Sequence, residues 1–226
     1  MATSYNPKVV TSGLALYLDA ANRESYPGSG SVWSDLSGNG NNCTFSGGYS
    51  FSSSGNGSVL FDGINGYGNV PDSPSISLTT ATASIWFKYS TAAGGGAVIM
   101  GKHDPAGSLN GFLIALSGGT IGVQVKGAST AYNTSFVAIN TNTWYNATTT
   151  FSSNSVVTFY LNGVLYSSVA IGALTSTTQP LRFADSVDTV WSIVGGSIGA
   201  ASMYNRVLTA SEIQQNFNAL RGRYGI

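Results

Sequence analysis

The chain has 226 residues, with 9 Lys and Arg against 9 Asp and Glu, so its formal net charge is zero and only 8% of its residues are charged. Because soluble globular chains average about 25% charged residues, Ser, Thr, Asn and Gly must cover most of this surface. Nucleic-acid binding is disfavoured, since phosphate recognition needs clustered cations and the basic residues are scattered singly, apart from Arg221 and Arg223.

The chain contains no apolar stretch long enough to span a bilayer, and its first ten residues lack the positive start and apolar run of a secretion signal. We therefore expect a protein that is made in a cytoplasm and is not inserted into a membrane. Cys43 is the single cysteine, so no internal disulfide can form, and we expect it to be a small buried apolar side chain.

Short segments of alternating apolar and polar residues, separated by Gly, Ser, Asn and Asp clusters, are typical of β-strands. The expected strands are residues 14–18, 58–61, 83–89, 97–100, 111–116, 120–125, 144–151, 156–161, 163–167, 181–183, 191–194 and 196–204. Asn162-Gly163 between two apolar runs predicts a tight type I′ hairpin turn. So many short strands without a dividing linker predict one all-β domain in which two antiparallel sheets pack as a sandwich.

Two terminal features complete the predicted organisation. Thr209-Ala-Ser-Glu212 has the pattern of a helix capping box, and the apolar residues after it follow helical spacing. The sequence therefore predicts one short helix over about 210–221, ended by Gly222 and packed on the sandwich. Residues 1–12 are expected to form a proline-broken arm that orders on a partner, with residues 13–226 as the single sandwich domain.

Six blocks in register resemble the laminin-G-like branch of the concanavalin A-like lectin/glucanase superfamily. They are an entry segment made of Gly13-Leu-Ala-Leu-Tyr-Leu-Asp-Ala-Ala-Asn22, Ser25-Tyr-Pro-Gly-Ser-Gly30 and Trp33-Ser-Asp-Leu-Ser-Gly-Asn-Gly-Asn41, then Leu60-Phe-Asp-Gly-Ile-Asn-Gly-Tyr67, Ser84-Ile-Trp-Phe-Lys88, Trp144-Tyr145, Phe159-Tyr-Leu-Asn-Gly163 and Met203-Tyr-Asn-Arg-Val-Leu-Thr-Ala-Ser-Glu-Ile213. The resemblance covers nearly the whole chain and implies a jelly-roll sandwich.

The two ends of the chain carry a narrower resemblance. The segments "YNPK", "LDAANRESYPGSG" and "QQNFNALRGRYGI" are similar to those of small virion-associated proteins of tailed bacteriophages. A phage particle assembles in the host cytoplasm and is released by lysis, which agrees with the missing secretion signal. This resemblance implies localisation in a virion.

Catalytic residue types are scarce. Glucanases of the superfamily carry two Glu and an Asp on one strand, because retaining hydrolysis needs two carboxyl groups about 5 Å apart. The only glutamates here are Glu24, in an early loop, and Glu212, in the capping box. The only histidine, His103, is expected in an exposed loop without a nearby nucleophile, and one His with one Cys does not supply a zinc site. We expect no enzymatic activity.

Calcium is the one metal that the resemblance suggests, held by loop oxygens at Asp62 and Asn65. Residues 199–201, Gly-Ala-Ala, stand where relatives carry acidic side chains, which would weaken such a site. The alternative is that Asp62 and Asn65 form a turn. No cofactor is expected to be required.

A glycan site would need an aromatic platform with amide or carboxylate groups on loops at one end of the sandwich. The candidates are Lys102, His103 and Asp104 in one loop, Tyr132 and Asn133 in a second, and Asp185, Asp188 and Trp191 in a third. The alternative for each of them is an ordinary structural role in its loop, without ligand binding. Trp33, Trp86 and Trp144 fall on strands or strand edges and are expected in the core.

The sequence therefore predicts a non-enzymatic virion structural module, a capsid decoration or tail-fibre protein that displays a lectin-like sandwich. Its expected partners are capsid or tail proteins, further copies of itself, and a host-surface polysaccharide. The alternative is a free carbohydrate-binding lectin, with or without calcium.

Overall fold

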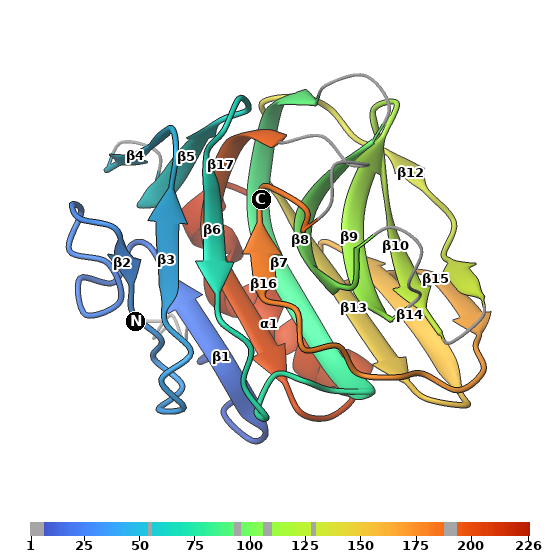
Figure 1. Cartoon of the computed structure of the whole chain (residues 1–226). Helices are drawn as coiled ribbons and strands as arrows, with labels where there is room; N and C mark the ends of the chain where they lie inside the picture. Colours follow the sequence, from blue (N-terminus) through green and yellow to red (C-terminus); the bar gives the residue numbers. More distant parts are fainter. Residues whose placement is uncertain (1–6, 54–55, 93–95, 106–109, 128–129, 188–193) are drawn as a thin grey trace, which may run out of the picture.

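The computed structural model describes residues 7–53, 56–92, 96–105, 110–127, 130–187 and 194–226. Two antiparallel sheets stack face to face and one helix lies behind them (Figure 1). The predicted all-β sandwich is therefore confirmed. No helix in the described ranges is long and apolar enough to cross a membrane.

We call the two layers sheet A and sheet B. Sheet A runs in the order β15 (Val164–Ala170), β14 (Val156–Leu161), β13 (Tyr145–Ser152), β7 (Thr80–Ala92), β17 (Val194–Tyr204), β5 (Ser58–Asp62) and β4 (Tyr49–Ser52), with β1 (Leu14–Asp19) also paired to β17. Sheet B runs in the order β11 (Ala131–Asn133), β10 (Thr120–Lys126), β9 (Gly111–Ser117), β8 (Ala97–His103), β16 (Leu181–Phe183), β6 (Tyr67–Val70), β3 (Cys43–Ser46) and β2 (Val32–Trp33), with β12 (Val137–Ala138) paired to β10.

The core lies between the two sheets, because successive side chains of a strand point to opposite faces. Val157 and Phe159 of β14 are fully buried against it, and Phe87 of β7 and Phe183 of β16 add aromatic volume. Cys43 is fully buried in the same cluster, as expected, and burial raises the pKa of its thiol.

The predicted strands are observed, except that residues 191–193 lie outside the described residues and Val194 begins β17. The hairpin turn is confirmed, since Asn162 and Gly163 have φ angles of 52° and 76°. Six short strands, β2, β3, β4, β6, β11 and β12, were not predicted. All six contain four residues or fewer, which is too short for alternation to be distinguished from a loop.

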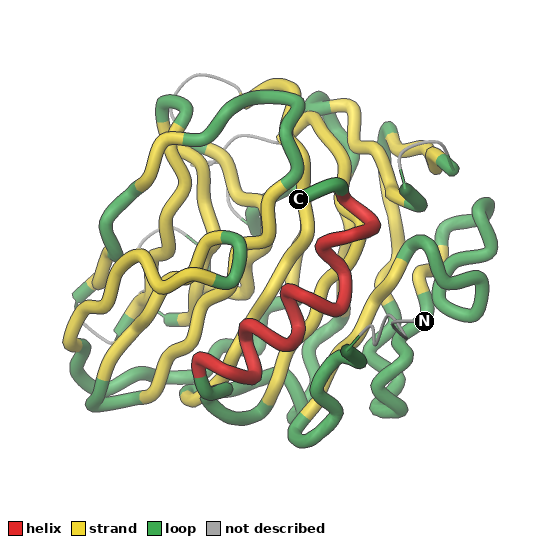
Figure 2. Tube along the Cα trace, turned by 180° about the vertical axis from the view of Figure 1, so that it is seen from behind, coloured by secondary structure: helices red, strands yellow, loops and turns green. Residues whose placement is uncertain are grey.

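The helix α1 (Ala210–Tyr224) crosses the outer face of sheet A (Figure 2). Its predicted capping box is confirmed: the Thr209 hydroxyl accepts from the Glu212 backbone N–H, and the Glu212 carboxylate accepts from the Thr209 backbone N–H. The predicted end at Gly222 is wrong. The helix continues to Tyr224 and closes at Gly225, whose φ of 75° is left-handed.

Residues 7–12, the described part of the expected arm, lie along α1 of the same chain. The Val10 backbone N–H donates to Asn216 Oδ1 at 2.7 Å, and the Tyr204 hydroxyl donates to the Val10 carbonyl at 2.9 Å. Val10 also packs against Leu208 and Ile213. This segment therefore helps to hold α1 on sheet A.

Candidate functional site

The end of β8 places Lys102 in the interior of the protein. Its side chain is 2% exposed, and Nζ donates to Asp72 Oδ1 at 2.6 Å and to the carbonyls of Thr177 and Gln179 at 2.7 and 2.6 Å. Burial lowers the pKa of Lys102, while the Asp72 carboxylate opposes that shift. The expected loop position is therefore wrong for Lys102. Its ammonium group connects the segments of Asp72 and of Thr177–Gln179 to β8, and it is not free to bind a ligand.

His103 is buried as well, at 1% exposure, so the exposed loop position expected for it is wrong. Its Nδ1 donates to the Asp104 carbonyl at 2.7 Å, and its Nε2 lies 2.9 Å from the Ser186 hydroxyl. The physical reason is that β8 continues three residues beyond the segment predicted for it, which carries both side chains into the fold.

The remaining glycan candidates divide between two places. Asp185 is next in sequence to Ser186, which His103 contacts, so its segment lies beside the end of β8. The Asp104 carboxylate accepts hydrogen bonds from Asn110 and Thr177. Asp185 pairs with Arg182 at 3.1 Å. Asp188 and Trp191 lie outside the described residues.

Tyr132 and Asn133 are on β11, which two strands, β10 and β9, separate from β8. At about 4.8 Å per strand, this puts them about 14 Å from Lys102. Tyr132 packs against the core, and the exposed Asn133 accepts from Gln124 Nε2 at 2.8 Å. The structure therefore does not join this loop to the β8 candidates.

Asp62 and Asn65 form a hydrogen-bonded turn. Asp62 Oδ1 accepts from the backbone N–H groups of Ile64, Asn65 and Gly66 at 2.9 to 3.1 Å, which lowers the pKa of the carboxyl group. Asn65 Oδ1 accepts from the Gly48 N–H at 2.7 Å. The turn that was the alternative to a calcium site is therefore formed, and among the described residues Asp62 belongs to no group of three or more acidic, His or Cys side chains.

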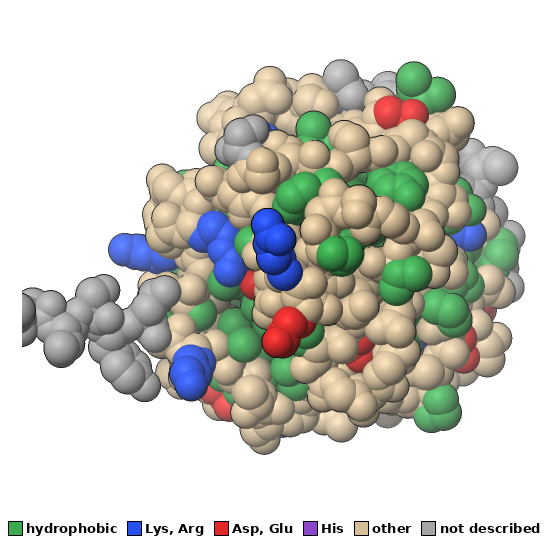
Figure 3. Space-filling view, turned by 90° about the vertical axis from the view of Figure 1, so that its left-hand side faces the viewer, with side chains coloured by type: hydrophobic (Ala, Val, Ile, Leu, Met, Phe, Trp, Pro, Cys, Tyr) green, Lys and Arg blue, Asp and Glu red, His purple; other side chains and the backbone are tan. Residues whose placement is uncertain are grey.

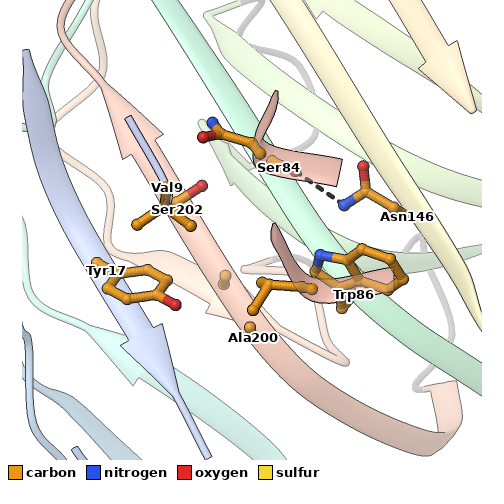
Figure 4. Close-up of a pocket in the computed structure, with 10 residues that line it drawn as sticks. Val9, Tyr17, Ser84, Trp86, Asn146, Ala200 and Ser202 are labelled. Carbon is orange, nitrogen blue, oxygen red and sulfur yellow. Dashed lines mark hydrogen bonds between the residues drawn. The ribbon is translucent and has the colours of Figure 1, made fainter. Parts of the chain in front are cut away.

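A cavity lies beneath α1, against the outer face of sheet A (Figure 4). Tyr17, Ser84, Trp86 and Asn146 line it, and Asn146 Nδ2 donates to Ser84 Oγ at 3.0 Å. Its volume of about 20 Å³ has room for a single water molecule. Trp86 and Trp144 are covered by the helix here, so all three tryptophans expected to be buried, Trp33 included, are so.

A larger hollow, of about 320 Å³, opens between residues 20–27 and the turn that joins β4 to β5. Its apolar wall includes the half-buried ring of Phe51 and the side chains of Tyr26 and Pro27. Its polar wall is made by Arg23, Ser53 and Asn56, which are exposed. Within the described part of the chain these three side chains have no hydrogen bond or ion pair, so their bonding capacity is free for a ligand.

The aromatic wall of this hollow is held rigidly from behind. The Phe51 and Tyr26 rings meet edge to face, with centroids 5.4 Å apart and planes at 61°, and Tyr26 meets Phe45 in the same way at 5.5 Å and 87°. The Tyr26 hydroxyl donates to the Gly30 carbonyl at 2.8 Å. A ligand that stacks on Phe51 would therefore not have to order the ring first.

The hollow depends on a close approach of two distant loops at Gly57. This residue has a φ of 69°, and a Cβ on it would lie 2.5 Å from the Cα of Ala21. Only glycine permits both the left-handed backbone and the contact. Two further depressions, of about 320 and 190 Å³, flank Leu60 on sheet A. The half-buried Tyr49 and Asp62, whose Oδ1 the turn already occupies, line the larger one, and Lys88 and Asn142 line the smaller one.

Figure 3 shows the side of the molecule that carries β2 and β4, at the left of Figure 1. Its surface is mostly uncharged, with several Lys and Arg side chains close to one another on one part of it. A polar ligand that is neutral or carries some negative charge suits such a surface.

Arg23, Phe51 and Asn56 were not among the residues chosen from the sequence. Phe51 lies on β4, which was not predicted, and Arg23 is separated from it by more than twenty residues. No local pattern predicts that the two line one hollow, because they lie on segments that are distant in the sequence.

The two-sheet architecture with a helix on one outer face defines the protein as a lectin-like β-sandwich domain. The family model of the concanavalin A-like lectin/glucanases superfamily matches residues 61–214. The chain belongs to this superfamily. A search of curated protein sequences found no match.

Solved structures share the fold at low sequence identity. Domain 4 of AbnA, a GH43 extracellular arabinanase from Geobacillus stearothermophilus, solved with arabinotriose, has a TM-score of 0.69 at 20% identity and covers 90% of this chain and 97% of that one. The binding domain of botulinum neurotoxin DC, solved with SialylT, has a TM-score of 0.72 at 14% identity and covers 93% of this chain. The binding domain of Paraclostridial Mosquitocidal Protein 1 has a TM-score of 0.73 at 17% identity.

The chain spans about half the length of the two toxin domains, 52% in each case. It matches the arabinanase domain over nearly all of that domain's length. At these identities the likeness shows the fold alone.

Proposed function

We propose that this protein is a non-catalytic carbohydrate-binding domain whose binding site is the hollow between residues 20–27 and the β4–β5 turn. The observation that carries the proposal is the preorganised Phe51 ring facing the same space as the unbonded side chains of Arg23 and Asn56. Sugar rings present an apolar face that stacks on an aromatic ring and hydroxyl groups that need hydrogen-bond partners, so this pairing of groups is complementary to them.

The size of the hollow agrees with this class of ligand. A volume of about 320 Å³ lies at the lower end of the range for small-molecule pockets, roughly 300 to 1,000 Å³, and suits one or two sugar units. The likeness to an arabinanase domain solved with arabinotriose gives further support, since that domain has the same architecture over nearly its whole length.

The absence of a suitable carboxyl pair supports a binding role. Hydrolysis of a glycosidic bond needs two carboxyl groups placed on either side of it. Glu24 is exposed, while the carboxylate of Glu212 accepts hydrogen bonds from Arg206 and from the Thr209 backbone N–H. Neither forms a group with other acidic side chains among the described residues.

The resemblance of the chain ends to phage virion proteins leads to a finer proposal, that the domain is displayed on a particle and binds polysaccharide of the host surface. The solved structures described above are toxin and arabinanase domains, so the virion role rests on the sequence resemblance. Co-sedimentation of the protein with purified particles tests it. If the protein is absent from every particle fraction, the virion role is wrong. The carbohydrate-binding function would then still be decided by the binding measurements below.

Affinity electrophoresis and calorimetry with arabinan, laminarin, agar and alginate test the binding function. Wild type should bind at least one of them, and Phe51→Ala, Arg23→Gln and Asn56→Ala should each weaken that binding by about tenfold, which corresponds to about 1.4 kcal/mol. Ile64→Ala and Arg221→Gln are matched controls, because both side chains are exposed and lie outside the hollow. Binding that survives all three hollow variants would overturn the assignment of the site, and no binding to any polysaccharide would overturn the function.

A further inference from the structure

Five Asn-Gly pairs occur in the chain. Asparagine is a chemically labile residue, and it deamidates most readily before glycine, which has no side chain to keep the following backbone nitrogen away from the amide carbon. In a folded protein the reaction also requires that the amide and this nitrogen are free to approach each other. The five pairs are Asn39-Gly40, Asn56-Gly57, Asn65-Gly66, Asn110-Gly111 and Asn162-Gly163.

Two of these pairs hold the Asn side chain through its amide nitrogen. Asn39 Nδ2 donates to the Ala15 carbonyl at 3.2 Å, and Asn110 Nδ2 donates to Asp104 Oδ2 at 2.6 Å. Rotation of either amide toward the next backbone nitrogen would break its hydrogen bond. Both side chains are therefore protected from the reaction.

Two more pairs hold the Asn side chain through its carbonyl oxygen. Asn65 Oδ1 accepts from the Gly48 N–H at 2.7 Å, and Asn162 Oδ1 accepts from the Asn146 N–H at 2.9 Å. Each bond fixes the oxygen to another segment of the chain. The amide carbon then cannot turn toward the following residue without losing the bond.

No hydrogen bond restrains the reacting groups of Asn56-Gly57. The Asn56 side chain is exposed and forms no hydrogen bond among the described residues, and the Gly57 N–H donates none there either. The backbone nitrogen of Gly66, by contrast, donates to Asp62 Oδ1 at 2.9 Å. Within the described ranges, Asn56-Gly57 is therefore the pair in which both the amide and the attacking nitrogen are free.

We propose that Asn56-Gly57 is a site of spontaneous deamidation in the folded protein, at which Asn56 is converted into aspartate and isoaspartate while the other four pairs stay intact. Solvent hydroxide removes the Gly57 N–H proton, and the nitrogen attacks Asn56 Cγ. The Cγ–Nδ2 bond breaks, ammonia leaves, and a cyclic succinimide forms. Water then adds to either carbonyl of this ring and opens it, which gives aspartate or isoaspartate.

The modification changes the hollow that Asn56 lines. Arg23 lines the same hollow, so a carboxylate at residue 56 places a negative charge beside the unpaired guanidinium group and pairs with it. Isoaspartate also adds one carbon to the backbone path where Gly57 passes Ala21, at a contact too close for a Cβ. We therefore expect the modified protein to bind polysaccharide more weakly. This consequence rests on the proposed function, whereas the modification itself does not.

Peptide mapping by mass spectrometry tests the site. The folded protein is incubated at mildly alkaline pH, and deamidation of each Asn-Gly peptide is followed with time. Asn56 should react at least about tenfold faster than any of the other four asparagines. In the chain unfolded by guanidinium chloride the five rates should converge, because the hydrogen bonds that protect four of them are lost.

Two variants control the measurement. Asn56→Gln should stop the reaction at this site, since the longer side chain closes a ring with the backbone nitrogen much more slowly. Asn39→Gln is the matched change at a protected pair and should leave the rate at Asn56 unchanged. Thermal melts establish that both variants fold. An Asn56 rate no higher than that of the protected asparagines would overturn the proposal, and so would faster deamidation at another Asn-Gly pair.

A binding measurement tests the consequence for the hollow separately. The affinity of wild type for its polysaccharide should fall during the incubation as Asn56 is converted, while that of Asn56→Gln should stay constant over the same time. An affinity that does not change while Asn56 is converted would overturn the effect on the hollow. If no polysaccharide binds, the proposed function is wrong, and peptide mapping still decides whether Asn56 is modified.

Discussion

The Tyr224 ring stacks on the Trp86 ring, with centroids 4.5 Å apart and planes 20° from parallel. Trp144, the residue before β13, meets the same ring with a centroid distance of 4.5 Å. This contact pins the last turn of α1 to sheet A and explains why the helix extends beyond Gly222. Tyr224→Ala should lower the free energy of unfolding by about 3 kcal/mol, measured by urea denaturation, because it removes a buried aromatic ring. A loss below about 1 kcal/mol would mean that the stack does not hold the helix.

Substitution by alanine should change the stability of the protein in opposite directions at Gly222 and at Gly225. Gly222 is inside the helix, and a Cβ on it would meet nothing within 4 Å, so Gly222→Ala should stabilise the protein by about 0.5 to 1 kcal/mol. Gly225 has a φ of 75°, which strains any residue with a Cβ, so Gly225→Ala should destabilise it. If Gly222→Ala were the destabilising change, the helix would end where the sequence predicts.

Glu212 should contribute a pH-dependent part of the stability. Its carboxylate accepts from both terminal nitrogens of Arg206, at 2.9 and 2.6 Å, and this pairing, together with the Thr209 N–H, lowers the pKa of Glu212 from 4.5 to about 2. A lowered carboxyl pKa means that the stabilisation is complete above pH 4.5 and is lost as the pH falls toward 2. The difference in melting temperature between wild type and Glu212→Gln should therefore shrink over this window. An unchanged difference at low pH would show that the charge of Glu212 is not what stabilises the cap.

Removing the Asp72 carboxylate should lower the free energy of unfolding, because the ammonium group of Lys102 would stay buried without its partner charge. We expect Asp72→Asn to lower stability by about 2 kcal/mol, and Asp72→Asn combined with Lys102→Met to recover part of it, since an apolar side chain of similar length replaces the ammonium group. A double-mutant cycle with urea denaturation measures the coupling. Additive effects of the two substitutions would contradict the pairing.

Arg23 should make binding to acidic polysaccharides sensitive to salt. Arg182, Arg206 and Arg223 each pair with a carboxylate, whereas Arg23 has no such partner among the described residues. The affinity of wild type for alginate should therefore fall as ionic strength rises. At low salt the Arg23→Gln variant should bind alginate more weakly than wild type, and its affinity should change little with ionic strength. Arg221→Gln is the control for a general loss of positive charge. Equal salt dependence in wild type and Arg23→Gln would show that Arg23 does not meet the anionic group.

The sequence by itself determined the features that depend on neighbouring residues. Alternation identified the long strands, Asn162-Gly163 the tight turn, and Thr209 with Glu212 the start of the helix, because each of these rests on hydrogen bonds or side-chain spacing within a few residues. Cys43, Trp33, Trp86 and Trp144 were also correctly expected to be buried.

Only the tertiary structure decided where the helix ends and which residues share a surface. Gly222 resembles a helix stop, yet the stacking of Tyr224 on Trp86 outweighs the local preference of a single glycine. Lys102 and His103 resemble loop residues, yet the long-range pairing of β8 with β9 carries them inside. The hollow at Phe51 and Arg23 arises because Gly57 lets two distant loops touch, and a contact between residues far apart in the chain leaves no periodic mark on the sequence.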